Sequence, residues 1–249
     1  MAYLAPLASV LGADARRLLR DRFLVGSFLY LVGTAVMMRW VLPWMTRALR
    51  GHRSFDLEPY YGLVISYFLV FLVPVLVGMI GGFLLLESRE DRSIRALRVT
   101  PLPIRAYLVG LSIVMTLVTA ILALLVASVI GLGQPPWSGM ILITSSGALG
   151  APLCALYLAT FAANKVEAFA QMKLVGASGL VLLGVYFVDP PWQLVACLVP
   201  PFWSVKAWWI AEANQECWFL WVLGGVVLSL GCVLLLLGRF EDHLRRGRE

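Results

Sequence analysis

Long apolar runs alternate with short polar segments along the whole chain. Six of the runs are long enough to cross the hydrocarbon core of a bilayer as helices, which takes about 20 residues. We predict these spans at residues 23–44, 60–86, 107–132, 139–163, 168–188 and 218–238. The pattern therefore indicates an all-α integral membrane protein with one six-helix domain over residues 23–238.

The first 22 residues have a different periodicity. Apolar side chains recur every third or fourth position from Leu4 to Leu19, and the arginines fall mainly on the other side. This is typical of an amphipathic helix that lies along a membrane surface. A signal peptide is the alternative, but the segment is too long for its charged region and no small-residue cleavage site follows. Residues 239–249 form a polar tail.

Composition supports the membrane assignment and limits the partners. The chain is 61% hydrophobic and only 14% charged, with a mean hydropathy of +0.87. The net charge of +6 would suggest nucleic acid in a soluble protein. Here the basic residues lie beside span ends, where membrane proteins place them, so we expect a lipid bilayer as partner and no nucleic acid.

The distribution of Lys and Arg predicts the orientation. One face of the predicted topology carries 15 of them and the other carries 4, which places both termini in the cytoplasm of a multi-pass protein of the bacterial cell membrane. Arg39, Arg47, Arg50 and Arg53 run against the rule. All nine tryptophans fall on the predicted outer side, as expected for interfacial anchors.

The outer segment 189–217 contains two proline pairs that bracket an apolar piece too short to cross, residues 194–199. We interpret it as a re-entrant or interfacial helical hairpin; a loop that rests on the membrane is the alternative. Cys197 and Cys217 both fall here and could pair. The four cysteines form no C-x-x-C motif and the two histidines lie on opposite sides, so no metal site is predicted.

Residues 87–105 join the second and third predicted spans and concentrate charge between two apolar runs. Asp91 can cap a short helix with Ile94 and Leu97 on one side and arginines around the remainder. That helix should stop at Thr100, because the residue before a proline avoids helical dihedrals, and Pro101 suits the first turn of the next helix. A force on the short helix would therefore move the third span.

Glu87, Ser93, Leu97, Thr100-Pro101-Leu102 and Tyr107-Leu108 resemble the pattern of type-2 ABC exporter permeases, although Ser93-Ile94 replaces the usual Gly-Thr. The resemblance extends to the amphipathic start, the six spans and the proline-rich outer hairpin. It implies that the 87–105 loop is a coupling helix docked on a cytoplasmic ATPase. The implied ATPase-coupling residues are Glu87, Arg89, Arg92, Ile94, Arg95, Leu97, Arg98, Thr100 and Pro101.

Three further segments, at 150–153, 164–167 and 203–208, resemble the subgroup described as fluoroquinolone-export permeases. A second ATPase contact could lie at Asn164, Lys165 and Glu167; the alternative is a short turn whose lysines anchor the inner face. Hydroxyl side chains could line a pathway, although hydroxyls in spans usually bond their own backbone or a neighbouring helix. The candidates are Thr144, Ser145, Tyr157 and Thr160.

Two absences bear on the energy source. No span has an ionisable residue near its middle, as an ion-driven carrier usually needs, and no G-x-x-x-x-G-K-[ST] motif is present. We therefore predict a non-catalytic permease subunit without a cofactor of its own, with ATP and Mg²⁺ in a partner ATPase subunit and a second permease subunit completing the pathway. Hydrophobic or amphipathic cargo is expected: a drug, a lipid or a lipid-linked molecule. A cytochrome c maturation-type permease with a haem chaperone and an intramembrane lipid-modifying enzyme are the alternatives.

Overall fold

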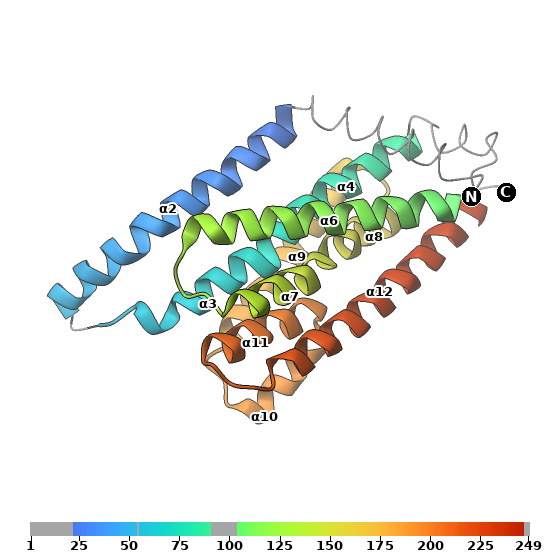
Figure 1. The fold of residues 1–249 in the computed structure, drawn as a ribbon. Coiled ribbons are helices and arrows are strands. Elements are labelled where there is room, and N and C mark those ends of the chain that lie inside the picture. The colour runs from blue at the N-terminus through green and yellow to red at the C-terminus, as the bar shows by residue number, and fades with distance from the viewer. Residues whose placement is uncertain (1–21, 54, 91–103, 247–249) are drawn as a thin grey trace.

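The protein is a bundle of helices that run along one another between two ends (Figure 1). The computed structural model describes residues 22–53, 55–90 and 104–246. Within them, six helices are long and apolar enough to cross a membrane, at Gly26–Gly51, Glu58–Arg89, Ile104–Ile130, Trp137–Phe161, Lys165–Val185 and Trp218–Asp242. The six-span prediction is confirmed. The predicted interfacial helix lies almost entirely outside the described residues.

The helices are labelled as in Figure 1. In chain order they are α2 (Arg22–Arg53), η1 (Glu58–Tyr60), α3 (Tyr61–Ser66), η2 (Tyr67–Leu72), α4 (Val73–Glu90), α6 (Ile104–Ile130), α7 (Trp137–Ala148), α8 (Gly150–Phe161), α9 (Lys165–Val185), α10 (Pro190–Gln193), η3 (Leu194–Leu198), α11 (Pro200–Glu212) and α12 (Trp218–Arg246). The fourth span comprises α7 and α8, which meet at a break near Leu149.

The second span changes its winding at η2, where six residues form a π-helix before α4 resumes the α form. Its wide turn is accommodated by glycines on two neighbouring helices. A Cβ at Gly147 of α7 would lie 2.8 Å from Cγ1 of Val70, and one at Gly179 of α9 would collide with the ring of Phe71. Glycine at these positions lets both helices approach the π-helix closely.

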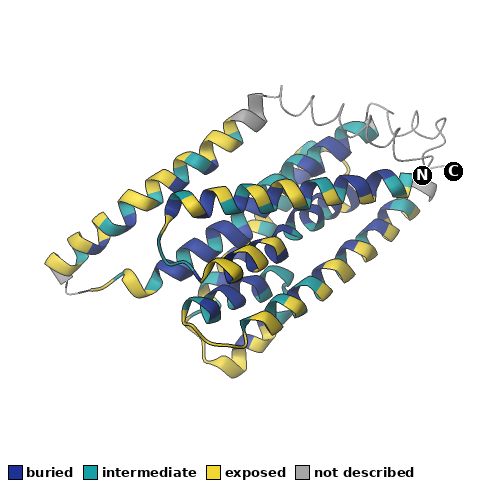
Figure 2. Ribbon diagram, viewed as in Figure 1, coloured by how far each residue is buried: buried dark blue, intermediate teal, exposed yellow. Residues whose placement is uncertain are grey.

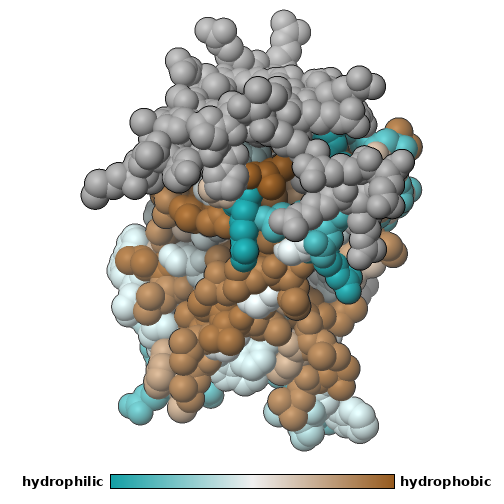
Figure 3. All heavy atoms as spheres, turned by 90° about the vertical axis from the view of Figure 1, so that its right-hand side faces the viewer, coloured by the Kyte–Doolittle hydropathy of each residue, from teal (hydrophilic) through white to brown (hydrophobic). Residues whose placement is uncertain are grey.

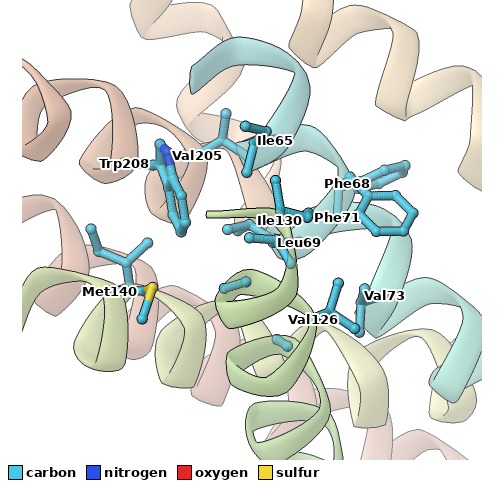
Figure 4. Close-up of a cluster of buried hydrophobic side chains, with 14 of the residues drawn as sticks. Ile65, Phe68, Leu69, Phe71, Val73, Val126, Ile130, Met140, Val205 and Trp208 are labelled. Carbon is cyan, nitrogen blue, oxygen red and sulfur yellow. The ribbon is translucent and has the colours of Figure 1, made fainter. Parts of the chain in front are cut away.

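The larger apolar core lies around this π-helix (Figure 4). Trp208 of α11 is fully buried and packs with residues of α3, η2, α6 and α7. Its indole N–H donates to the carbonyl of Gly133, 3.1 Å away, in a loop where Gly133 adopts a φ of 49°. Helices gain little by leaving lipid for one another, so such close packing and polar contacts hold them together.

A second core lies at the opposite end, where Leu85, Tyr107, Leu108 and Phe240 are all buried. The second and fourth spans are the most enclosed, whereas α2, α9 and α12 carry many exposed side chains (Figure 2). On the face shown in Figure 3, hydrophobic side chains form a broad area, and hydrophilic ones lie mainly toward the top and the bottom of the view. This distribution is expected of a surface that contacts lipid.

Two arginines that oppose the predicted orientation have partners. Arg39 of α2 donates to the carbonyl of Val129 at 2.8 Å, near the C-terminus of α6, where helix carbonyls lack intrahelical donors. Arg50 bonds Asp56 at 2.7 Å and Glu58 at 2.6 Å, and this guanidinium lowers the pKa of the Asp56 carboxyl. The charge excess of this segment is therefore smaller than a count of arginines suggests.

The segment between α9 and α12 is helical for most of its length, in α10, η3 and α11. Pro200 and Pro201 begin α11, as prolines suit the first helical turn. α11 packs against α12, α7 and α3, while its re-entrant position stays a prediction. Cys197 and Cys217, which could have paired, are both free thiols.

Candidate coupling surface at the charged end

The C-terminal part of α4, the turn between α8 and α9, and the C-terminal part of α12 meet at one end of the bundle, which we call the charged end. Lys165 at the start of α9 lies 3.7 Å from the carboxylate of Glu87 on α4. Both side chains are about 40% exposed, with side-chain values of 43% and 37%. An exposed pair of this kind is worth roughly 0.2–1 kcal/mol, so its role is to set position rather than to add much stability.

Arg89, two residues further along α4, links this helix to α8 and α12. Its guanidinium donates to the carbonyl of Ala159 at 2.7 Å and lies 6.0 Å from the centre of the Phe240 ring on α12. Ala159 is in the last turn of α8, so its carbonyl has no intrahelical donor and carries the negative end of the helix dipole. A cation satisfies both requirements at once.

The α8–α9 turn is closed by a reciprocal pair of hydrogen bonds. Asn164 is the N-cap of α9 and accepts from the backbone N–H of Glu167 at 2.9 Å. The Glu167 carboxylate in turn accepts from the backbone N–H of Ala163 at 2.8 Å. This arrangement is close to a capping box, and Gln171 adds a bond to the carbonyl of Phe161 at 2.9 Å. The turn therefore has a defined shape at the charged end.

The structure thus brings the described members of the two predicted ATPase contacts together, since Glu87, Arg89, Asn164, Lys165 and Glu167 share this end. The other predicted coupling residues lie outside the described residues. They are Arg92, Ile94, Arg95, Leu97, Arg98, Thr100 and Pro101.

The four candidate pathway residues do not form one hydrogen-bonded group among the described residues. Thr144 and Ser145 both bond backbone carbonyls four residues earlier in their own helix, at 2.7 Å each, as the alternative interpretation expected. Tyr157 packs against the Phe161 ring, 5.2 Å between centres. The buried hydroxyl of Thr160 has no hydrogen-bond partner in the described part of the chain.

Sequence reasoning missed a second group of residues, at the other end of the bundle, which we call the tryptophan end. There Tyr60, Tyr186 and Trp209 pack ring against ring, and the Glu212 carboxylate lies against Gly62. The signal available was the three-residue spacing of Lys206, Trp209 and Glu212 on one predicted helical segment. In the described ranges, no three His, Cys, Asp or Glu side chains are grouped so that they could hold a metal ion.

Comparison with known proteins identifies the family. The family model described as "Fluoroquinolones export permease protein Rv2686c-like" matches residues 14–237. Two Mycobacterium tuberculosis proteins, the fluoroquinolones export permease proteins MT2760 of strain CDC 1551 / Oshkosh and Rv2686c of strain ATCC 25618 / H37Rv, are each 29% identical over 231 residues. The matches cover 92% of this chain and 91% of each relative. This multi-pass membrane protein therefore belongs to the Rv2686c-like family of fluoroquinolone export permeases.

Proposed function

We propose that this chain is the membrane subunit of an ATP-driven exporter of the bacterial cell membrane. In this proposal the charged end faces the cytoplasm, the chain pairs with a second permease subunit, and separate ATPase subunits supply the energy. The family match and the relatives' names support drug export. The 15-to-4 distribution of basic residues and the 87–105 sequence pattern support the orientation and the ATPase partner.

The observation that carries the proposal is the link between the two candidate ATPase contacts. The C-terminal end of α4 and the start of α9 are joined by the Glu87–Lys165 pair at 3.7 Å. Arg89 connects the same end of α4 to α8 and α12. A displacement of either contact by an ATPase would therefore be shared by several spans, which is what conversion of ATP-driven movement into a change of access requires.

The proposed cargo is a fluoroquinolone or a similar flat, amphipathic drug. The relatives are named for fluoroquinolones. The surfaces exposed on the single chain are mainly apolar, so drugs that partition into the bilayer could reach the path between two permease subunits from the inner leaflet.

The experiment uses the full chain co-expressed with its ATPase and reconstituted in lipid nanodiscs. Wild type should retain the ATPase during purification, and a fluoroquinolone should stimulate ATP hydrolysis. Replacing both Leu97 and Arg98 with Asp should abolish retention and stimulation, because it puts acids on both sides of the proposed docking helix. Glu216→Lys changes a charge at an exposed position after α11, at the other end of the bundle, and should leave both unchanged.

The same preparation tests the link between the two contacts. Glu87→Lys and Lys165→Glu should each lower drug-stimulated hydrolysis by a few-fold, and the double exchange should restore part of it because opposite charges again face each other. ATPase retention and stimulation that survive the Leu97/Arg98 double variant would refute the docking assignment.

A further inference from the structure

The tryptophan end carries a continuous cluster of aromatic rings drawn from segments far apart in the sequence. Tyr60 of η1 lies 6.1 Å from Tyr186 and 5.9 Å from Phe187, which follow α9. Tyr186 lies 4.9 Å from Trp209 of α11 in an edge-to-face arrangement. Phe187 is 68% exposed and Tyr60, Tyr186 and Trp209 are half-buried, so the cluster is accessible from outside the chain.

Glu212, the last residue of α11, places a carboxylate beside these rings. Its oxygen occupies the space that a side chain at Gly62 would fill, so a Cβ at Gly62 would collide with it. The residue is half-buried, and burial raises the pKa of this carboxyl from 4.5 to about 7. The pKa of the Tyr186 hydroxyl is raised by burial and, as a smaller effect, by the negative charge of Glu212.

The carboxylate forms no hydrogen bond or ion pair with any other described residue. The other charge on α11, Lys206, is engaged elsewhere: it donates to the Gln193 side chain at 2.7 Å and lies 5.7 Å from the centre of the Trp209 ring. A half-buried carboxylate next to aromatic rings, with no cation paired to it among the described residues, favours an external cation.

We propose that this cluster binds the protonated amine of a flat aromatic cargo, with the Glu212 carboxylate paired to the ammonium and the Tyr60 and Tyr186 rings against its apolar surroundings. The inference rests on the proposed export function and names the part of the cargo that this end recognises. Carboxylates form strong charge-assisted hydrogen bonds with ammonium groups, and tyrosine rings attract cations through their π-faces. Fluoroquinolones that carry a piperazine ring present such an amine on fused aromatic rings.

The position of the aromatic cluster in the bundle indicates the stage of transport at which it would contact the cargo. The cluster lies at the end remote from Glu87 and Lys165, where the ATPase is proposed to bind, so it would meet cargo on the release side. An aromatic belt at a membrane interface explains Trp and Tyr by itself. It does not explain the Glu212 carboxylate, which has no partner in the described part of the chain and occupies the space that the absent side chain of Gly62 leaves open.

The experiment compares two probes with the same ring system: a piperazinyl fluoroquinolone, and its derivative with the distal piperazine nitrogen acetylated and therefore uncharged. Binding to the full chain in nanodiscs is measured by equilibrium dialysis at pH 7.5. Wild type should bind the amine about tenfold more tightly than the acetylated probe. Glu212→Gln should reduce this preference to less than about twofold, and Gly62→Ala should weaken it by displacing the carboxylate.

Glu216→Gln is the matched control, because Glu216 is exposed in the turn directly after α11 and should keep the full preference. Thermal unfolding of each variant verifies that the fold is intact. A Glu212→Gln variant that still prefers the amine overturns the inference about this cluster. In that case, drug-stimulated ATP hydrolysis by wild type would still support the proposed export function. Failure of wild type to bind or transport either probe would overturn both.

Discussion

Replacing Arg89 with Met should loosen the charged end, because the shorter, apolar side chain carries neither the charge nor an N–H donor. The change removes a charged hydrogen bond to the Ala159 carbonyl, at 2.7 Å, worth about 1.5–3 kcal/mol. It also removes a cation near the C-terminus of α8 and above the Phe240 ring, at 6.0 Å, each worth about 0.3–1 kcal/mol. Because these terms overlap, we expect a loss of about 2–4 kcal/mol in the free energy of unfolding.

The assay is thermal unfolding in detergent, followed by intrinsic tryptophan fluorescence, and a loss of this size should lower Tm by roughly 5–10 °C. Arg89→Lys keeps the charge but not the planar guanidinium, so its effect should be intermediate. Arg105→Met is the control, because Arg105 is exposed at the start of α6 and should cost under about 0.5 kcal/mol. Equal Tm values for Arg89→Met and Arg105→Met would refute the role assigned to Arg89.

Two further outcomes follow from the described contacts. Asn164→Ala should destabilise the α8–α9 turn by about 1 kcal/mol through loss of the cap to Glu167, measurable as faster amide exchange in the first turn of α9, whereas Asn164→Asp should preserve protection. Binding of the piperazinyl probe should strengthen by up to about tenfold between pH 6 and 8, since Glu212, with its pKa raised by burial to about 7, is mostly neutral below that pH and carries its negative charge above it. Among the described titratable groups, Tyr186 interacts with Glu212 and Tyr60 with Tyr186, while Lys206 is the other charge of α11. The pH dependence should vanish in Glu212→Gln; its persistence would assign the titration to another group.

The number and approximate positions of the spans could be predicted from the sequence because a hydrocarbon core imposes one length on every crossing helix. The predicted fifth span began at residue 168, whereas α9 begins at Lys165. The prediction overlooked a signal in the sequence: Asn164 is followed three residues later by Glu167, a pattern that predicts the N-terminus of a helix at that position. Lys173, the charged residue inside the predicted fifth span, lies at an exposed position of α9.

Contacts between distant segments could not be predicted from one sequence. Neither the pairing of Glu87 with Lys165 nor that of Arg39 with the Val129 carbonyl has any local signal. The π-helix at Tyr67–Leu72 was also missed, because a long apolar run reads the same in either winding. From the sequence, the tryptophan end was interpreted only as a membrane anchor. The proximity of Gly62 to Glu212 could not be predicted, because it depends on how α3 packs on α11.

The π-helix η2 has a geometric consequence for the rest of its span. Each residue of an α-helix turns the chain by about 100°. An extra residue in the wide turn therefore rotates the rest of the span, C-terminal to η2, by roughly that angle about the helix axis. Closing the bulge would swivel Glu87 and Arg89 out of register with α8, α9 and α12. The close packing of Gly147 and Gly179 against η2 therefore opposes rotation of the second span about its axis. It thereby keeps Glu87 and Arg89, roughly four helical turns further along, directed at their partners.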